Sequence, residues 1–522
     1  MPVDRAAAAL LATMGPDERL GQLFMLAYQG DEPTPLLYDW IRARGLGGVK
    51  IFGWNADDTG VLAESIAAIQ DAAAGGPHDI PPFIATDQEG GWIRHVKGKT
   101  SVTPGNMAIG ASGWPSDAYQ SALYIGRELS ALGITMNFAP TVDLATRPDS
   151  SIIGVRAFSS DPQDTAVLAA AFTRGLADAG VAATAKHFPG HGDTPLDSHG
   201  VLPVIEADAD TVWNRELVPY RLLASEGIAG VMSGHLAYPA LSGSAVPASL
   251  SPDIIQGLLR ERMGYDGLVI TDDLFMTGAW APGGMAEMCE RAIRAGNDIL
   301  MFSRTLGFND AAWTRLRDLY RDDSGFRDQV DRSATRVLKA KLTWLLPRGR
   351  DGIGPAPAAE SALRSAESAA FFRQQAQRGA TLLGTLPGDG FGRVVLAGQY
   401  GAFLEQGAAA LPGAVAFRYS AALGTEPDAG ELASFQALLR GADSAVVCVA
   451  NAAGAAYARE VLAAGKRLAV VSVLSPVHAL EFRDTAAVVA VYSYAREAFQ
   501  AAFSVLSGAV PAIGRLPVRT EG

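Results

Sequence analysis

The chain has 522 residues, a formal net charge of -12 and two cysteines. Its length allows two to four domains, and its charge argues against the basic stripe of a nucleic-acid-binding protein. Two cysteines far apart in sequence form neither a disulfide framework nor a zinc cluster. The first residues lack a cationic leader, and no run of about 18 apolar residues appears. We therefore expect a cytoplasmic protein that neither spans a membrane nor binds nucleic acid.

Short apolar segments recur through the first 345 residues, each followed by a turn rich in Gly, Pro or Asp and then by a helical stretch. In chain order they are FMLAY (24–28), VKIF (49–52), FIAT (83–86), MNF (136–138), AATAK (182–186), AGVMS (229–233), LVIT (268–271) and ILMF (299–302). Eight strand–helix units can close into a barrel. The pattern predicts a TIM-type (β/α)8 barrel over residues 1–345, with long loops after the strands.

A second domain is expected after the barrel. The Pro- and Gly-rich segment 346–360 is typical of a linker. Five further apolar segments follow it, separated by Ala-rich helical stretches: 381–384, 394–398, 445–450, 468–474 and 487–494. They predict a smaller α/β sandwich domain with a parallel sheet over residues 361–522. No G-x-G-x-x-G motif opens a helix there, so we expect no dinucleotide and no other cofactor.

Polar residues come directly after the predicted barrel strands. They are Asp87, Asp143, Lys186 with His187, His235, and Asp272 with Asp273. Asp is common in turns and helix caps, so each position alone has an ordinary structural explanation. Together they favour an active site, because barrel enzymes carry theirs at the C-terminal ends of the strands.

The segment KHFPGHGDTPLDSHG (186–200) carries three His, two Asp and one Lys among glycines and prolines that forbid a regular helix or central strand. It is predicted to be an exposed loop. Asp197 and His199 lie two residues apart, so in an extended loop both side chains project from the same side. A carboxylate beside an imidazole fixes its tautomer and raises its basicity, which suits proton transfer near neutral pH.

A metal site is the competing interpretation of this loop. His187 and His191 are four residues apart, and nearby carboxylates could complete a ligand shell. Such a His pair binds metal best on a helix, and Pro189 and Gly190 stand between the two. We therefore expect no metal.

The segment GLVITDDLFM (267–276) reads as a buried strand that ends in two aspartates. If the strand continues through them, Asp272 and Asp273 point to opposite sides. One can act as a nucleophile at the barrel mouth while the other caps the following turn. A carboxylate suits a glycosyl centre, where it traps an oxocarbenium-like species as a covalent ester.

These motifs resemble glycoside hydrolase family 3, in particular its two-domain β-N-acetylglucosaminidase branch. The long motif KHFPGHG…DSH (186–199) is similar to that branch almost letter for letter. Further similar segments follow the same order along the chain: 15–25, 86–91 (TDQEGG), 137–145, 152–161, 249–276, 295–302 and 498–518. The resemblance implies a retaining enzyme that acts on a small carbohydrate with a terminal GlcNAc.

The resemblance also implies roles for individual residues. Asp272 corresponds to the nucleophile, His199 to the acid/base and Asp197 to its partner. The positions that correspond to sugar-hydroxyl ligands are Asp87, Arg156, Lys186 and His187. In the glucosidase branches the second domain supplies a carboxylate acid/base. The His–Asp loop makes that unnecessary, so we expect the second domain to support the barrel.

Two alternatives remain open at this point. A neutral imidazole does not repel an anionic acceptor, so phosphate could replace water and make the enzyme a β-N-acetylglucosaminide phosphorylase. A catalytically inactive sugar-binding barrel is the other. One departure also stands out: the branch usually has Arg after DQEGG and again three residues later, whereas this chain has Trp92 and His95, with Arg94 shifted by one. Either Arg94 compensates or the subsite is built differently.

Overall fold

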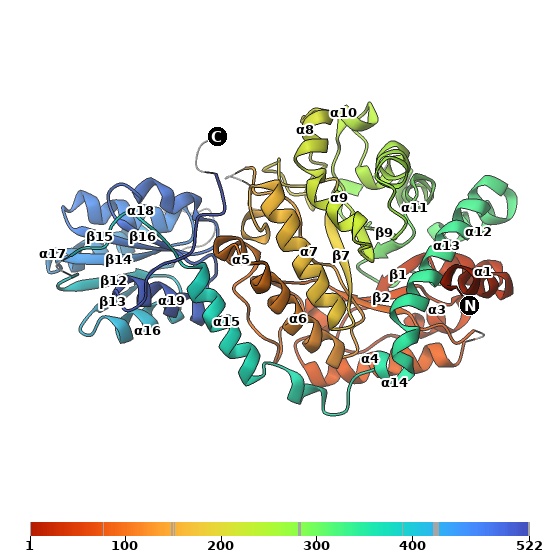
Figure 1. Cartoon of the computed structure of the whole chain (residues 1–522), viewed down its shortest axis with the longest axis horizontal. Helices are drawn as coiled ribbons and strands as arrows, with labels where there is room; N and C mark the ends of the chain where they lie inside the picture. Colours follow the sequence, from red (N-terminus) through yellow and green to blue (C-terminus); the bar gives the residue numbers. More distant parts are fainter. Residues whose placement is uncertain are drawn as a thin grey trace.

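The computed structural model of the chain describes residues 2–76, 78–147, 150, 152–279, 283–388, 390–420 and 427–519. Two lobes lie side by side (Figure 1), with the N-terminal barrel on the right and the smaller C-terminal domain on the left. Helix α15 (Ala366–Gly379) lies where the two lobes meet.

The described part of the N-terminal lobe contains an eight-stranded parallel sheet in the order β10-β1-β2-β3-β6-β7-β8-β9. A bridge between Ile270 and Ile299 joins its two edges, so the sheet closes into the barrel predicted from the sequence. The strands are β1 (Phe24–Ala27), β2 (Gly48–Ile51), β3 (Phe83–Thr86), β6 (Met136–Asn137), β7 (Ala182–Phe188), β8 (Gly230–Ser233), β9 (Leu268–Thr271) and β10 (Leu300–Phe302).

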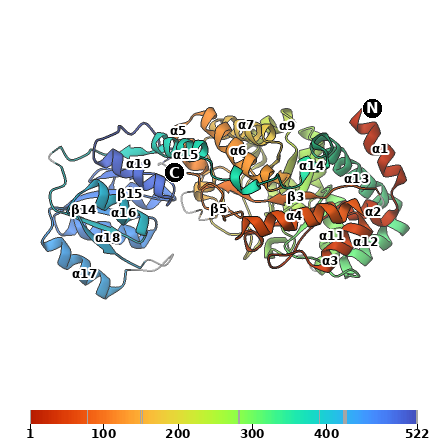
Figure 2. The same cartoon turned by 90° about the horizontal axis from the view of Figure 1, so that it is seen from below.

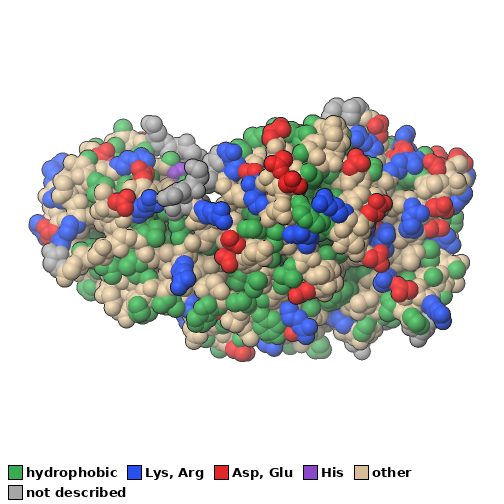
Figure 3. Space-filling model, turned by 45° about the horizontal axis from the view of Figure 1, so that its top comes forward, with side chains coloured by type: hydrophobic (Ala, Val, Ile, Leu, Met, Phe, Trp, Pro, Cys, Tyr) green, Lys and Arg blue, Asp and Glu red, His purple; other side chains and the backbone are tan. Residues whose placement is uncertain are grey.

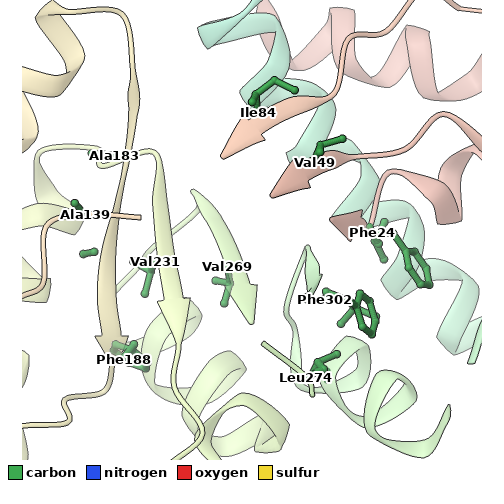
Figure 4. Close-up of a cluster of buried hydrophobic side chains, with 14 of the residues drawn as sticks. Phe24, Val49, Ile84, Ala139, Ala183, Phe188, Val231, Val269, Leu274 and Phe302 are labelled. Carbon is green, nitrogen blue, oxygen red and sulfur yellow. The ribbon is translucent and has the colours of Figure 1, made fainter. Parts of the chain in front are cut away.

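Hydrophobic side chains of these strands fill two layers, because successive residues of a strand point to opposite faces. On β1, Met25 packs with the cluster inside the barrel, whereas its neighbour Phe24 packs with the cluster between strands and helices. Figure 4 shows the outer layer along neighbouring strands, where Val231 and Val269 lie side by side and Phe24 stacks on Phe302 at 5.7 Å between ring centroids. Both faces of each strand are buried, which is why the segments read as continuous apolar runs.

Helices cover the outside of the barrel, and several begin at an Asp that caps the first turn. The carboxylates of Asp58, Asp161 and Asp310 accept hydrogen bonds from backbone amides at the starts of α4, α7 and α12. The helices of this lobe are α1 (Val3–Thr13), α2 (Pro16–Gly21), α3 (Pro35–Arg44), α4 (Thr59–Ala74), α5 (Asn106–Ser112), α6 (Pro115–Ala131), α7 (Pro162–Asp178), α8 (Ala209–Asn214), α9 (Leu217–Ser225), α10 (Pro239–Ser242), the π-helix Asp253–Arg262, α11 (Gly284–Ala295), α12 (Ala311–Asp322), α13 (Ser324–Trp344) and α14 (Gly349–Ile353).

The C-terminal domain is a six-stranded sheet, in the order β11-β16-β15-β14-β12-β13, with helices on both faces. The expectation of a parallel sheet is corrected at one edge, because β11 pairs antiparallel with β16. Its strands are β11 (Thr381–Leu383), β12 (Val394–Gly398), β13 (Val415–Arg418), β14 (Ser444–Val449), β15 (Arg467–Ser472) and β16 (Ala487–Ala490). The further helices are α16 (Gly401–Ala410), α17 (Ala429–Arg440), α18 (Ala452–Ala463) and α19 (Arg496–Leu506).

The segment between the lobes runs beneath the barrel before it enters α15 (Figure 2). It contains α14 and the short 3-10 helix Ala359–Ala362. The boundaries at 345 and 361 stay a prediction. Polar contacts then fasten α15 to the barrel helix α6: Arg378 forms an ion pair with Asp117 at 2.6 Å, and Gln375 donates to Ser121 Oγ at 2.6 Å.

The last described segment also returns to the barrel, since the amide of Ser160 donates to the Pro517 carbonyl at 2.9 Å. On the face drawn in Figure 3, acidic, basic and hydrophobic side chains are interspersed over both lobes. Among the described helices, none combines the length and apolar composition that crossing a membrane requires.

Candidate active site

A cavity of about 410 Å³ opens where the barrel strands end. It lies at the face where the loops after the strands meet, which is where barrel enzymes carry their active sites. The structure brings all seven sequence-predicted site residues to its wall: Asp87, Arg156, Lys186, His187, Asp197, His199 and Asp272.

The floor of the cavity is a network of buried charges around Lys186. The Lys186 ammonium pairs with the carboxylates of both Asp87 and Glu89. Lys50, which is fully buried on β2, approaches Asp87 Oδ2 to 2.8 Å, and Arg156 forms two hydrogen bonds to Glu89 at 2.7 and 2.9 Å. Lys50 and Glu89 were not predicted from the sequence. A lysine inside an apolar strand was the available signal for the first, because an unpaired buried charge is costly.

These pairings keep the two carboxylates ionised. Burial alone would raise their pKa values. For Asp87, the positive charges of Lys186 and Lys50 outweigh burial, so its pKa lies well below its usual range. Arg156 and Lys186 likewise lower the pKa of Glu89 to about 2. The network therefore offers fixed charges and hydrogen-bonding groups to a ligand with several hydroxyls.

Replacing Glu89 by Gln is expected to destabilise the fold at pH 7 by about 3 kcal/mol, because Arg156 and Lys186 lose a buried partner. A carboxyl whose folded-state pKa is depressed contributes stability above its unfolded pKa, and that contribution disappears as pH falls through the folded value. The difference in unfolding free energy between wild type and the variant should thus shrink as pH drops from about 4.5 toward about 2.

Denaturant unfolding of wild type and Glu89→Gln across this pH range measures the effect. The exposed ion pair of Glu481 with Arg459 provides the control, and Glu481→Gln should leave the unfolding midpoint unchanged. A deficit independent of pH would contradict the role of the Glu89 charge.

His187 is held by Asp143, a residue that follows β6. The His187 imidazole Nδ1 lies 2.7 Å from Asp143 Oδ2, and the backbone amides of His187 and His191 both donate to Oδ1 of the same carboxylate. Asp143 is buried, yet His187 and His191 lower its pKa to about 2. The ionised carboxylate fixes Nδ1 of His187 as a donor and leaves Nε2 facing Arg156 Nη2 at 3.5 Å.

Both aspartates after β9 line the cavity, but their bonding differs. Asp272 is at the cavity wall. Burial raises its pKa, but His187, His235 and the hydrogen bond from the Asp273 amide outweigh burial, so the pKa is lowered. Asp272 is therefore a carboxylate at neutral pH. Asp273 Oδ1 accepts from the amides of Phe275 and Ser303 at 3.1 and 3.0 Å. It therefore caps the turn, the role expected for one member of the pair.

His235 is hydrogen-bonded to the main chain of this turn. Its Nε2 lies 3.0 Å from the carbonyl oxygen of Asp273, and its Nδ1 lies 2.8 Å from Ser249 Oγ. Burial lowers its pKa, so the ring is neutral. A neutral ring donates Nε2–H to the carbonyl and accepts at Nδ1 from the hydroxyl. It is a fully bonded core histidine that fixes the main chain at Asp273.

The loop at residues 189–200 is anchored at three points. The amide of His191 donates to Asp143, Arg215 pairs with Asp193 at 2.5 Å, and the Ser198 carbonyl accepts from Gly278 N at 3.0 Å. Residues 195–197 and 199–200 are exposed, whereas Thr194 between the anchors is buried. The loop has the irregular structure expected from its sequence, and its anchors hold it over the cavity.

Asp197 and His199 lie on this loop as an exposed pair. His199 Nδ1 is 2.7 Å from Asp197 Oδ1, and 68% of the His199 side chain is exposed. Partial burial raises the pKa of Asp197, but the hydrogen bonds from the His199 amide and ring, with the His199 charge, together outweigh it, so its pKa is lowered. The ionised carboxylate accepts Nδ1–H, which leaves the His199 Nε2 free for proton transfer.

The hairpin β4 (Gln88–Gly90) and β5 (Ile93–Arg94) resolves the departure noted after DQEGG. Arg94 does not line the cavity and donates instead to the carbonyls of Thr100 and Ser101, both at 3.0 Å. Trp92 and His95 do line it. Burial lowers the pKa of His95 to about 4, so its neutral Nδ1 accepts from Lys50 Nζ at 3.2 Å and its proton resides on Nε2.

Within the described ranges of the chain, no group of three or more His, Cys, Asp or Glu side chains could hold a metal ion. The His187 and His191 rings lie 5.8 Å apart at 74° to each other, and His187 is bonded to Asp143. Cys289 and Cys448 are buried and unpaired.

The model of the glycosyl hydrolase family 3 N-terminal domain matches residues 16–340. The chain belongs to glycosyl hydrolase family 3. The family predicted from the sequence is thereby confirmed, and the match covers the barrel with its cavity.

Curated relatives of this family 3 chain carry hexosaminidase names. It is 34% identical to beta-hexosaminidase A of Pseudoalteromonas piscicida over 59% of its own length and 55% of the relative. It is 32% identical to the beta-N-acetylglucosaminidase/beta-glucosidase of Cellulomonas fimi (72% and 66%) and 35% identical to beta-hexosaminidase LpqI of Mycobacterium tuberculosis (65% and 87%). The chain thus spans between about half and two thirds of the first two relatives.

Solved structures share both lobes of this family 3 chain. A family 3 beta-N-acetylglucosaminidase from Paenibacillus sp. is 30% identical, with a TM-score of 0.88 over 97% of this chain and 99% of the other. The beta-glucoside phosphorylase BglX, at 22% identity, has a TM-score of 0.84 over 99% and 97%. The second likeness shows the fold alone, and both confirm the two-domain architecture.

Proposed function

We propose that the protein is a retaining β-N-acetylglucosaminidase that releases terminal GlcNAc from β-glycosides. One observation carries the proposal: an ionised carboxylate, Asp272, and a His199–Asp197 pair line the same cavity. A nucleophile and a proton donor on one sugar-sized cavity are the two groups that retaining hydrolysis requires. The hexosaminidase names of the relatives support GlcNAc as the sugar.

In the first step, Asp272 attacks the anomeric carbon while His199 Nε2 gives its proton to the leaving oxygen. The glycosidic bond breaks as the ester to Asp272 forms. In the second step, His199 takes a proton from water, and the resulting hydroxide displaces Asp272 from the opposite side. Two inversions retain the anomeric configuration. The Asp197 carboxylate holds His199 in the tautomer that both steps need.

The buried floor supplies the sugar contacts in this proposal. Four side chains line the cavity beside Asp272, and each is held by a charged partner: Asp87 and Lys186 by each other, Arg156 by Glu89 and His187 by Asp143. Hydrogen bonds from prepaired charges need little reorganisation when the sugar binds. A polar floor of this kind favours a hydroxyl-rich ring over an apolar ligand.

Water is the acceptor that the cavity favours over phosphate. Among its described wall residues the Lys and Arg side chains are Lys186 and Arg156, and both are already paired with Asp87 and Glu89. A phosphate dianion would find no unpaired Lys or Arg there. Phosphorolysis therefore lacks the cationic clamp that usually binds a phosphoryl group.

Product analysis with an aryl β-N-acetylglucosaminide tests the proposed function. We expect free GlcNAc as the product, with the same rate and the same product when phosphate is added. GlcNAc-1-phosphate as the main product would overturn hydrolysis. No release from the aryl glycoside under either condition would overturn the glycosidase proposal itself.

The biological setting is a further part of this proposal. We propose cell-wall muropeptides or chitin fragments as natural substrates and peptidoglycan recycling in the cytoplasm as the role. The C-terminal domain supports the barrel in this account, fastened to it through Asp117 and Arg378. Cell fractionation and analysis of accumulated muropeptides in a deletion strain would test the location and the role.

A further inference from the structure

We propose that the protein binds a second small molecule, an aliphatic monocarboxylate, in a cavity at the end of the barrel opposite the candidate active site. This cavity lies between α1, α13, α14 and the loop before β3, and its volume is about 370 Å³. That volume is within the range of small-molecule pockets. The inference does not depend on the proposed function, because the two cavities share no lining residue.

The contacts of Lys341, which lines this cavity, place it where the barrel strands begin. Lys341 belongs to α13 and is 3% exposed. Its Nζ donates to Gln22 Oε1 at 2.8 Å, two residues before β1, and lies 5.9 Å from the ring centroid of Phe83, the first residue of β3. The candidate active site is at the other ends of the strands, so the packed interior of the barrel separates the two cavities.

Lys341 is a buried amine without an anionic partner among the described residues. The bond to Gln22 uses one of the three donors that an ammonium group has, and no described Asp or Glu forms an ion pair with it. Two other buried lysines of the barrel differ, because Lys50 and Lys186 both pair with Asp87. A buried ammonium ion without an anion is costly. A ligand carboxylate in the cavity would supply the missing partner.

The rest of the wall is mainly apolar, which suits an aliphatic tail. Leu338 packs in one hydrophobic cluster with Leu10, Ile80 and Leu342. Leu346, which also lines the cavity, is 59% exposed, so the cavity opens to solvent beside an apolar side chain. Lys341 is the one Lys or Arg in the described part of the wall. One amine in an apolar pocket matches a monocarboxylate, whereas a phosphate dianion would need further donors.

The other charged groups around Lys341 lie at the rim or have partners of their own. His78 and Asp79 line the cavity as well; Asp79 is exposed, and His78 Nε2 is 3.3 Å from Glu18 Oε2. On the described elements packed against α13, charged side chains are engaged elsewhere: Asp4 with Lys339, Arg19 with Asp331, and Arg348 with the Gly180 carbonyl. Lys341 is therefore the group that a carboxylate would meet inside the cavity.

Proton linkage gives this site a distinctive pH dependence. Burial lowers the pKa of the Lys341 amine to about 7 in the free protein. A bound carboxylate favours the charged amine and raises that pKa, so binding above the free-protein value requires uptake of a proton. Affinity for a carboxylate should thus be greatest below that value and fall as pH rises, by up to about tenfold per pH unit. A neutral ligand should show no such dependence.

Calorimetric titration of the protein with octanoate and with octanamide tests the inference. At about pH 6, octanoate should bind one site per chain roughly 10- to 100-fold more tightly than the amide, and this difference should shrink toward about pH 9. Shorter carboxylates should bind about fourfold more weakly for each methylene removed. Equal affinity for octanoate and octanamide, or no binding of octanoate at millimolar concentration, would overturn the inference.

Lys341→Met locates the site, because it keeps an apolar side chain of similar length and removes the charge. The variant should lose the preference for octanoate and its pH dependence while still binding octanamide. Lys339→Met is the matched control on the same helix, since Lys339 does not line the cavity, and it should match wild type. Histidine also changes charge near neutral pH, so His78→Gln is the second control and should keep the pH dependence.

Unchanged octanoate binding in Lys341→Met would contradict the assignment to this cavity. The comparison of the two ligands in the wild-type protein decides the question even if that variant does not fold. Hydrolysis of the aryl glycoside is a separate measurement, so the proposed function can fail while this inference stands, and the reverse.

Discussion

Replacing Asp272 by Ala is expected to lower kcat on an aryl β-N-acetylglucosaminide by roughly 10⁴-fold, because the reaction loses the carboxylate that traps the oxocarbenium-like sugar. Asp272 is ionised at the cavity wall, and its loss leaves the Lys186 network in place. Circular dichroism and substrate binding should therefore remain close to those of wild type.

Sodium azide separates a missing nucleophile from a damaged fold. In the Asp272→Ala variant the azide anion can attack from the side that the carboxylate occupied, and the product should be the α-glycosyl azide. Asp273→Asn is the control, because the amide oxygen can still accept from Phe275 and Ser303. It should keep most of its activity and give no azide product. If azide restored the activity of Asp273→Asn but not that of Asp272→Ala, the nucleophile would be Asp273 and the assignment to Asp272 would be wrong.

Replacing His199 by Ala is expected to slow the enzyme by a factor that depends on how much the leaving group needs a proton. With N,N′-diacetylchitobiose the loss should be about 10²- to 10⁴-fold, since the departing oxygen needs a proton. With a 2,4-dinitrophenyl glycoside, whose leaving group departs as a stable anion, formation of the covalent ester should be nearly unaffected. Presteady-state release of dinitrophenolate measures that step directly.

The control for His199→Ala is His478→Ala, an exposed histidine of the C-terminal domain. It should match wild type with both leaving groups. An intermediate loss is expected for Asp197→Ala, because the imidazole remains but loses the carboxylate that orients it. A loss of the same size for every leaving group in His199→Ala would contradict general acid catalysis by this residue.

Most of the fold could be predicted from the sequence because its strands are buried on both faces. Segments such as FMLAY and LVIT are continuous apolar runs, and each contains a strand of the structure. Strand β13 was missed because it is a sheet edge with mostly exposed side chains. The antiparallel pairing of β11 was missed as well, since an apolar run carries no sign of its direction.

The candidate site was predictable where chemistry is concentrated in a motif. The 186–200 segment displays its polar residues among glycines, and Asp272 ends an apolar strand, so both stand out in the sequence. Lys50 and Glu89 were missed because their importance lies in pairing with residues distant along the chain. Sequence spacing also could not show that Arg94 binds two carbonyls while Trp92 faces the cavity.

Covalent labelling tests the central claim most directly. A 5-fluoro-β-N-acetylglucosaminyl fluoride should form the sugar ester rapidly and release it slowly, so the intermediate accumulates and can be located by peptide mass spectrometry. We expect one sugar per chain, attached to Asp272 in the peptide that follows β9. A label on any other carboxylate, or continued turnover with no labelled peptide, would contradict the account.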